Sequence, residues 1–158
     1  MFTPNSIPLA PGCYILIIRV EKDVNIKVGS LGYVPLRKGL YVYCGSARGK
    51  GALCLRHRIL RHLKRRKKVR WHIDYILSND NVKIVGIVYT ITRVNMECTF
   101  ATKLLETGKF LIVKRRLGST DCKCPSHFLG YLGDSIRDLV NLITSIFDEK
   151  IKLIMLEA

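Results

Sequence analysis

Short apolar runs rich in β-branched residues, separated by polar turns, fill much of the chain. Such runs are typical of strands, and they predict strands over residues 12–20, 26–31, 39–44 and 82–89. The first three are joined by a polar turn and by a loop, residues 32–38, so the first third of the chain is predicted to be a β-meander. A last strand is predicted over residues 127–132.

Other segments show apolar residues at a spacing of three or four. This period predicts amphipathic helices over residues 52–67, 96–106 and 134–147. A short helix is expected to follow Trp71. Asn95 is placed to cap the second amphipathic helix and Gly108 to end it. Together these elements predict the α+β class, with a central, mostly antiparallel sheet flanked by helices.

The length of 158 residues suits one compact domain with a core of its own. We expect residues 1–132 to form this domain. Residues 133–158 would supply a C-terminal amphipathic helix and an apolar tail packed on the same domain. The tail, residues 151–156, could instead pack on a second subunit, and the sequence leaves the oligomeric state open.

Composition changes this picture through its charge. The chain is 48% hydrophobic and 25% charged, as globular proteins are, but it has 27 Lys and Arg against 12 Asp and Glu, a net charge of +15. Such a field favours polyanions, with nucleic acid first and an anionic membrane surface second. No apolar run approaches the ~20 residues of a membrane span, and no signal peptide is evident. We therefore expect a cytoplasmic protein.

The positive charge is concentrated in one segment. Nine of the fifteen residues from Arg56 to Arg70 are basic and none is acidic. An unrelieved block of one sign repels itself, which favours phosphate contacts over a merely solvated helix face. A second basic cluster follows residue 113. The predicted nucleic-acid contacts are Arg61, Lys64, Arg65, Arg66, Lys67, Lys68, Arg70, Lys114, Arg115 and Arg116.

Candidate chemistry begins at the strand that precedes this segment. Tyr43 lies near the end of the strand, and Gly45 allows the backbone to leave it. Arg58 and His62 are four residues apart on the helix, so they share one face. A phenol, a guanidinium and an imidazole near one point suit a phosphate better than a neutral metabolite. Arg56 is a rival for the role of Arg58.

These residues fall into a known pattern. Gly12-Cys13-Tyr14 and Tyr43-Cys44-Gly45 resemble the two tripeptides that name the GIY-YIG nuclease superfamily, and residues 58–62 resemble its Arg-x-x-x-His helix. Glu97 resembles its metal-binding glutamate. The chain is most similar to a branch of unassigned function, sometimes fused to endonuclease III, with counterparts of residues 71–75 and 119–127. The resemblance covers residues 12–132.

The resemblance implies a divalent-metal-dependent endonuclease that hydrolyses phosphodiester bonds in DNA or RNA. It implies Mg²⁺ or Mn²⁺ at Glu97, for which Glu106 is a weaker rival. The catalytic residues it implies are Tyr14, Tyr43, Arg58 and His62. The alternative is a nucleic-acid-binding module that keeps a GIY-YIG-like fold without cutting. Trp71 would belong to the core or, alternatively, stack on a base.

The cysteines pose a separate question. Cys122, Cys124 and His127 supply three of the four ligands of a closed zinc site, and the fourth could be Cys98 or His72. Structural thiols, a Zn²⁺ site and a disulfide are the three interpretations. We expect the three side chains to lie close together at one end of the last predicted strand. The remaining cysteines, which include Cys98, are expected to be free and mostly buried.

Overall fold

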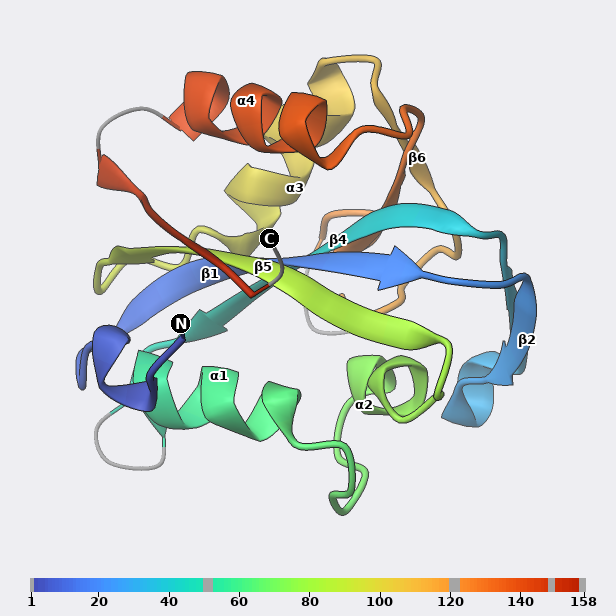
Figure 1. Cartoon of the computed structure of the whole chain (residues 1–158), viewed down its shortest axis with the longest axis horizontal. Coiled ribbons are helices and arrows are strands. Elements are labelled where there is room, and N and C mark those ends of the chain that lie inside the picture. Colours follow the sequence, from blue (N-terminus) through green and yellow to red (C-terminus); the bar gives the residue numbers. More distant parts are fainter. Residues whose placement is uncertain (1, 50–52, 120–122, 148–149, 157–158) are drawn as a thin grey trace.

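A six-stranded antiparallel sheet forms the centre of the computed structural model, which describes residues 2–49, 53–119, 123–147 and 150–156 (Figure 1). The strands lie in the order β6-β7-β4-β1-β5-β8. In that order their bounds are Phe110–Ile112, Phe128–Tyr131, Gly39–Ala47, Gly12–Val20, Val82–Ile91 and Lys152–Met155. The predicted α+β class, an antiparallel sheet flanked by helices, is confirmed.

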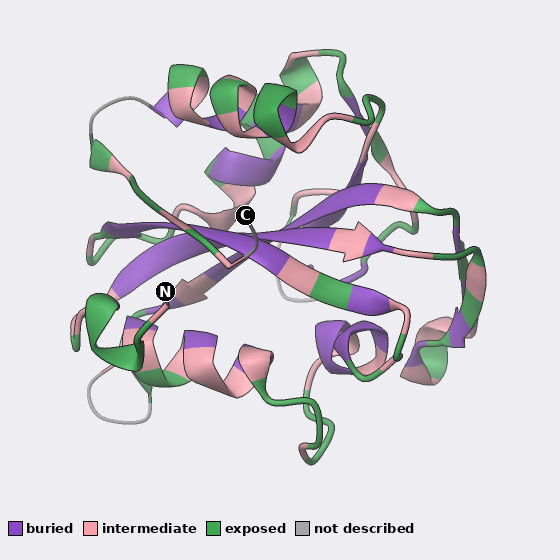
Figure 2. Ribbon diagram, in the orientation of Figure 1, coloured by how far each residue is buried: buried purple, intermediate pink, exposed green. Residues whose placement is uncertain are grey.

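Helices cover both faces of this sheet. Helices α1 (Leu55–Leu63) and α2 (His72–Leu77) lie on one face, and α3 (Glu97–Glu106) and α4 (Ile136–Phe147) lie on the other (Figure 1). Alternate side chains of a strand point to opposite faces, so β1 contributes to both apolar clusters. This double burial explains why residues 12–20 are apolar almost throughout, and Figure 2 shows the central strands buried along most of their length.

The predicted meander is wrong. Strand β1 pairs with β4 and β5, whereas β2 (Val24–Lys27) and β3 (Tyr33–Leu36) form a separate two-stranded sheet. The short helix η2 (Gly29–Leu31) connects them, so residues 26–31 are not one strand and residues 32–38 are not all loop. Strands β1 and β4 are both nine residues long and pair along their whole length, which buries both runs more completely than a short hairpin would.

Helix α1 is shorter than the predicted segment 52–67. It ends at Leu63, and Lys67 Nζ folds back to donate to the carbonyls of Arg61 and His62, at 3.1 and 2.8 Å. These carbonyls belong to the last turn, and the Arg61 carbonyl also accepts from the backbone N–H of Lys64 at 3.2 Å, so the lysine caps the helix instead of extending it. Residue 52, the predicted start, lies outside the described residues.

The C-terminal segment adds elements beyond the last predicted strand. Strand β8 follows α4 near the end of the described chain. At the other end of the chain, a short η1 helix (Pro4–Ser6) precedes β1. Strand β8 pairs with β5 over Gly86–Tyr89, so residues 127–132 do not contain the final strand. Phe147 of α4 packs on Phe100 of α3, with ring centroids 4.6 Å apart. None of the helices in the described ranges is both long enough and apolar enough to cross a membrane.

Candidate active site

A small cavity lies where β4 continues beyond its pairing with β7. Strand β7 pairs with β4 only over Tyr41–Tyr43, and the Cys44 N–H then bonds to the His127 carbonyl at 2.9 Å. The carbonyl of Ser46, further along the same edge, accepts from Arg58 Nη1 at 3.0 Å. The cavity has a volume of about 200 Å³ and is lined by Tyr14, Tyr43, Ser46, Arg58, Trp71, Glu97, Gly118 and His127.

The Tyr14 ring owes its position to a glycine. Tyr14 on β1 lies directly opposite Gly45 on β4. A Cβ atom at position 45 would lie 2.5 Å from Tyr14 Cζ and 2.6 Å from its hydroxyl oxygen. Glycine is therefore required at position 45 because the phenol occupies the space of a side chain.

Tyr14 is hydrogen-bonded to a buried histidine. Its hydroxyl lies 2.6 Å from His62 Nε2, and His62 is only 2% exposed. Burial, reinforced by the charge of Lys67, lowers the pKa of His62 to about 3, so the imidazole is neutral at pH 7. A neutral Nε2 can accept the Tyr14 proton. Nδ1 of His62 is buried and has no hydrogen-bond partner within the described residues.

The two tyrosines of the cavity are held protonated. Burial raises the pKa of Tyr14 well above its usual value, and the nearby Tyr43 adds to the shift while Arg58 opposes it. Burial likewise raises the pKa of Tyr43, with Glu97 adding to the effect and Arg58 again opposing it. At neutral pH both phenols therefore offer a hydroxyl, and that of Tyr14 is in contact with a proton acceptor, His62 Nε2.

Arg58, and not its rival Arg56, reaches the cavity. The Arg58 guanidinium carbon lies 4.6 Å from the centroid of the Trp71 ring, and its Nη1 bonds to Ser46. Arg56 instead donates from Nε to the Ile7 carbonyl at 2.7 Å, which ties α1 to the N-terminal segment. The geometry therefore separates two arginines that the sequence left as alternatives.

Glu97 supplies the carboxylate of the cavity. It lies in the first turn of α3, and Ser46 Oγ donates to its Oε2 at 3.1 Å. Glu106, at the other end of α3, is exposed and does not line the cavity. A carboxylate beside a hydroxyl offers hard oxygen ligands and leaves room for water, which suits Mg²⁺ or Mn²⁺. The residues present thus fit such an ion.

Arg61 is engaged inside the protein. Its Nη1 and Nη2 donate to the two carboxylate oxygens of Asp74 at 3.0 and 2.9 Å, and Nη2 also reaches the Lys68 carbonyl at 2.8 Å. Burial alone would raise the pKa of Asp74, but bonds from Arg61 and from the backbone N–H groups of Arg70 and Trp71 outweigh it and lower that pKa.

The rest of the basic segment divides in two. Arg65 bonds to the Val82 carbonyl at 3.0 Å and to exposed Asp80 at 3.2 Å, and Lys67 caps α1. Seven other predicted contacts, from this segment and from the second basic cluster, are exposed: Lys64, Arg66, Lys68, Arg70, Lys114, Arg115 and Arg116. Arg70 precedes Trp71 and Arg116 lies two residues before Gly118, so both cations are close in sequence to residues that line the cavity. Their contact with nucleic acid stays a prediction.

A sulfur cluster adjoins the same cavity. Cys98 and Cys124 are paired as a disulfide, so the expectation of a free Cys98 is wrong. His127 Nε2 lies 3.3 Å from Cys98 Sγ, and the three ligand atoms lie within 4.8 Å of one another. Cys122, which the sequence placed in this cluster, lies outside the described residues. Nδ1 of His72 accepts from the Gly118 N–H at 3.1 Å and thereby fixes one wall of the cavity.

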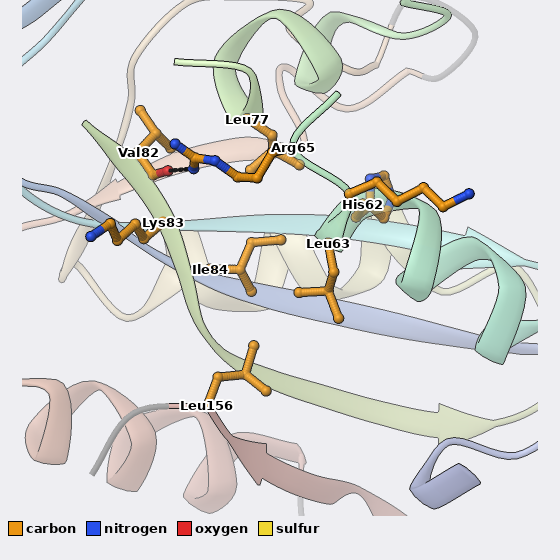
Figure 3. Close-up of a pocket in the computed structure, with 9 residues that line it drawn as sticks. His62, Leu63, Arg65, Leu77, Val82, Lys83, Ile84 and Leu156 are labelled. Carbon is orange, nitrogen blue, oxygen red and sulfur yellow. Dashed lines mark hydrogen bonds between the residues drawn. The ribbon is translucent and has the colours of Figure 1, made fainter. Parts of the chain in front are cut away.

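A larger cavity, of about 430 Å³, lies between the end of α1, α2 and β5 (Figure 3). Leu63, Ile84 and Leu156 line it with apolar groups, and Arg65 bonds to Val82 beside them. His62 is the one predicted catalytic residue among the described residues that line it. Because none of these residues carries a carboxylate, this cavity is not where the predicted chemistry gathers.

Comparison with known proteins places the chain in a family. The family model for a domain of unknown function, DUF123, matches residues 13–150. No curated protein and no solved structure matches the chain. The family description names no activity, so any functional proposal rests on the residues of the cavity and on the charged surface around it.

Proposed function

This chain belongs to the DUF123 family, and we propose that it is a divalent-metal-dependent endonuclease acting on DNA or RNA. One observation carries the proposal: a single cavity is lined by Tyr14, Tyr43, Arg58 and Glu97. Phosphodiester hydrolysis needs a metal ligand, a cation for the phosphoryl charge and a group that handles the attacking water. The similarity to GIY-YIG nucleases supports the same assignment, since it names these four positions.

Glu97 would hold Mg²⁺ or Mn²⁺, and the Ser46 hydroxyl bonded to it would orient the carboxylate. The ion would polarise the phosphate and stabilise the leaving oxygen. Because the cavity offers one carboxylate among its described lining residues, the other positions around the ion would be filled by water and by substrate oxygens.

Arg58 would neutralise the charge that grows on the phosphoryl oxygens. Its guanidinium is held by the Ser46 carbonyl on one side and by the Trp71 ring on the other. A cation that is already oriented costs little reorganisation when the charge develops, which is what makes electrostatic stabilisation effective.

Tyr14 and His62 would handle the proton of the attacking water. The Tyr14 oxygen would take that proton while its own proton passes to His62 Nε2, 2.6 Å away. Burial disfavours a charged imidazolium, but a phosphate anion at Arg58 would counter this and raise the pKa of His62. Tyr43, whose ring packs edge-on against His62 at 5.8 Å, would orient the water.

The alternative function is nucleic-acid binding without cleavage. The net charge of +15 and the exposed cations near the cavity favour it, because positive charge binds nucleic acid whether or not Glu97 holds a metal. The two functions differ in whether a metal bound at Glu97 leads to cleavage of the nucleic acid.

The test is a cleavage assay on linear and branched DNA and RNA, with Mg²⁺ or Mn²⁺ and with a chelator. We expect cutting that requires the metal and that falls by at least ~100-fold in Glu97→Gln. Glu106→Gln is the matched control, since it removes a charge from the same helix outside the cavity. If Glu97→Gln cuts as the wild type does, the assignment is wrong. Binding without cutting on every substrate would favour the alternative.

A further inference from the structure

Three soft donors meet beside the cavity. Sγ of Cys98 lies in the first turn of α3, and Sγ of Cys124 and Nε2 of His127 come from the segment that leads into β7. All three atoms lie within 4.8 Å of one another. We propose that Cys98, Cys124 and His127 form a Zn²⁺ site when the cysteine pair is reduced.

The orientation of His127 carries the proposal. Its side chain is 2% exposed, and Nε2 faces Cys98 Sγ at 3.3 Å, close to the separation of two ligands around one zinc ion. The backbone of Gly118 accepts a hydrogen bond from the same ring. A histidine that binds a metal through one nitrogen and a backbone carbonyl through the other is the usual arrangement in zinc sites.

A disulfide alone does not account for the position of the His127 ring beside the two sulfurs. The sulfurs of a disulfide carry no proton to donate, so they give a buried imidazole nitrogen little in return for its desolvation. Two thiolates and an imidazole around Zn²⁺ would satisfy every donor with a strong bond. The described chain then supplies three ligands, and solvent can take the fourth position.

Ligand type separates this site from the proposed one at Glu97, although residues 97 and 98 are adjacent. Thiolate and imidazole ligands select zinc over Mg²⁺, whereas a carboxylate with water selects Mg²⁺ or Mn²⁺. Both thiolate charges are balanced by Zn²⁺, so the cluster would be neutral. Glu97 and His127 line the same cavity, so the carboxylate would favour a cation beside it.

Conversion of the disulfide into the reduced, zinc-binding pair requires a dithiol reductant. The reductant delivers two electrons and two protons, the bond between the two sulfurs breaks, and two thiols form while the reductant becomes a disulfide. Zn²⁺ then displaces the two thiol protons, which leave to solvent, and His127 binds as neutral imidazole.

The site would brace the cavity. Glu97 and His127 both line it, and they lie on two segments that the cluster joins. A bound ion would fix the first turn of α3 against the start of β7, as the disulfide does in the oxidised chain. This placement predicts that metal binding stabilises the fold as well as the cluster.

The experiment measures zinc in the full chain. The protein is reduced, loaded with Zn²⁺, desalted and assayed with a chromophoric chelator; a second sample is treated in the same way after oxidation. We expect one equivalent in the reduced protein, none in the oxidised protein, and a higher melting temperature for the loaded form. Reduced wild-type protein that retains no zinc would overturn the proposal.

Variants identify the ligands. Cys98→Ser, Cys124→Ser and His127→Ala should each lose the retained zinc. Cys54→Ser and His57→Ala are matched controls, because Cys54 Sγ and His57 Nδ1 form another cysteine–histidine contact, at 3.6 Å. They should retain one equivalent. Zinc that survives all three ligand changes would place the site elsewhere and overturn the assignment.

A probe that needs no variant covers the case in which these proteins fail to fold. Co²⁺ bound to the reduced wild-type chain should show the intense charge-transfer absorption of thiolate ligands, and oxidation should abolish it. Co²⁺ spectra without thiolate bands would contradict the proposal. None of these measurements uses cleavage, so a protein that binds zinc but cuts nothing would refute the proposed function alone.

Discussion

The cavity and the neighbouring junction between α1 and α2 each contain an arginine, and the two arginines have different partners. Arg58 and Arg61 lie three residues apart on α1, and both guanidinium carbons lie over the Trp71 ring, at 4.6 and 4.3 Å from its centroid. In the junction between α1 and α2, Arg61 meets both oxygens of Asp74, which is 0% exposed. In the cavity, Arg58 meets the Ser46 carbonyl and the ring, and neither of these carries a negative charge.

The difference lies in whether a charge is neutralised by the fold. A buried carboxylate neutralises Arg61 and makes it part of the packing between two helices. The carbonyl and the ring orient Arg58 without cancelling its charge, and the carboxylate that lines the same cavity, Glu97, is the proposed metal ligand. With a metal ion at Glu97, the charge of Arg58 would be available to a substrate anion. Helical position and residue type are alike in the two cases, so the partner decides which arginine stabilises the fold and which can serve a substrate.

The largest effect is expected when the junction is broken. Arg61→Ala should lower the free energy of unfolding by about 3–5 kcal/mol, because it leaves a buried carboxylate without its cation. Arg58→Ala should lower it by less than about 1 kcal/mol, because the bond it removes is to a carbonyl and not to a buried charge. Urea unfolding at pH 7 measures both. Equal losses would mean that the two arginines do not differ in the way their partners indicate.

The second prediction reverses the order of the two arginines. Arg58→Ala should slow cleavage by about 10²–10³-fold, the usual cost of removing one oriented donor to developing charge. Nucleic-acid binding should change little. Arg58→Lys should not restore the rate, because an ammonium group lacks the planar guanidinium that stacks on Trp71. Arg56→Ala, on the same helix, is the control and should cut normally; a slow Arg56→Ala protein would favour the rival arginine.

His62 lies at the border of the two regions and predicts a dependence of stability on pH. Its pKa is about 3 in the folded protein against 6.5 ordinarily. Below pH 6.5 the unfolded chain therefore binds a proton that the folded chain refuses, so stability falls as the pH falls towards 3. The slope should be about 1.4 kcal/mol per pH unit for this group.

Urea unfolding between pH 7 and pH 4.5 tests this slope, with His62→Gln as the comparison. The variant should be flatter, although His127, whose pKa is also lowered by burial, will leave part of the slope. Asp74 acts in the same direction, but only near and below its ordinary pKa of 3.8. A His62→Gln protein with an undiminished slope would show that His62 is not kept neutral by the fold.

The sequence predicted the cavity better than the junction. Tyr14, Tyr43 and Gly45 lie on strands whose apolar runs mark them clearly, and antiparallel pairing of β1 with β4 then sets Tyr14 against Gly45. Arg58 follows on an amphipathic helix with a clear period. Local pattern therefore identifies the strands and the helix that carry these side chains, whereas the resemblance to GIY-YIG nucleases singled out Tyr14 and Glu97.

The engagement of Arg61 could not be predicted, because it depends on how α2 docks against α1. Asp74 is one acidic residue after a basic block, and nothing local distinguishes a buried carboxylate from a solvated one. The separate β2–β3 sheet and the pairing of Cys98 with Cys124 were missed for the same reason. Each depends on packing between segments distant along the chain, and the period of one segment does not report it.

The smallest effect per residue is expected on nucleic-acid binding, when exposed cations of the basic segment are replaced. The comparison of Arg58 with Arg61 extends to this whole segment. The sequence offers nine basic residues between 56 and 70, but Arg56, Arg61 and Lys67 are occupied with backbone or carboxylate groups. A quadruple alanine variant should therefore replace the more accessible set: Lys64, Arg66, Lys68 and Arg70.

This variant should weaken nucleic-acid binding and flatten the dependence of log K on log salt by up to about 0.9 for each duplex phosphate that the protein no longer neutralises. Its control removes four exposed cations far from the segment in sequence: Lys22, Lys109, Arg137 and Lys152. Both proteins lose the same net charge, so a binding surface at the cavity predicts a flatter slope only in the first. Equal slopes in the two variants would mean that the overall field attracts the polyanion, and that the residues beside Arg58 do not form the surface on which it lies.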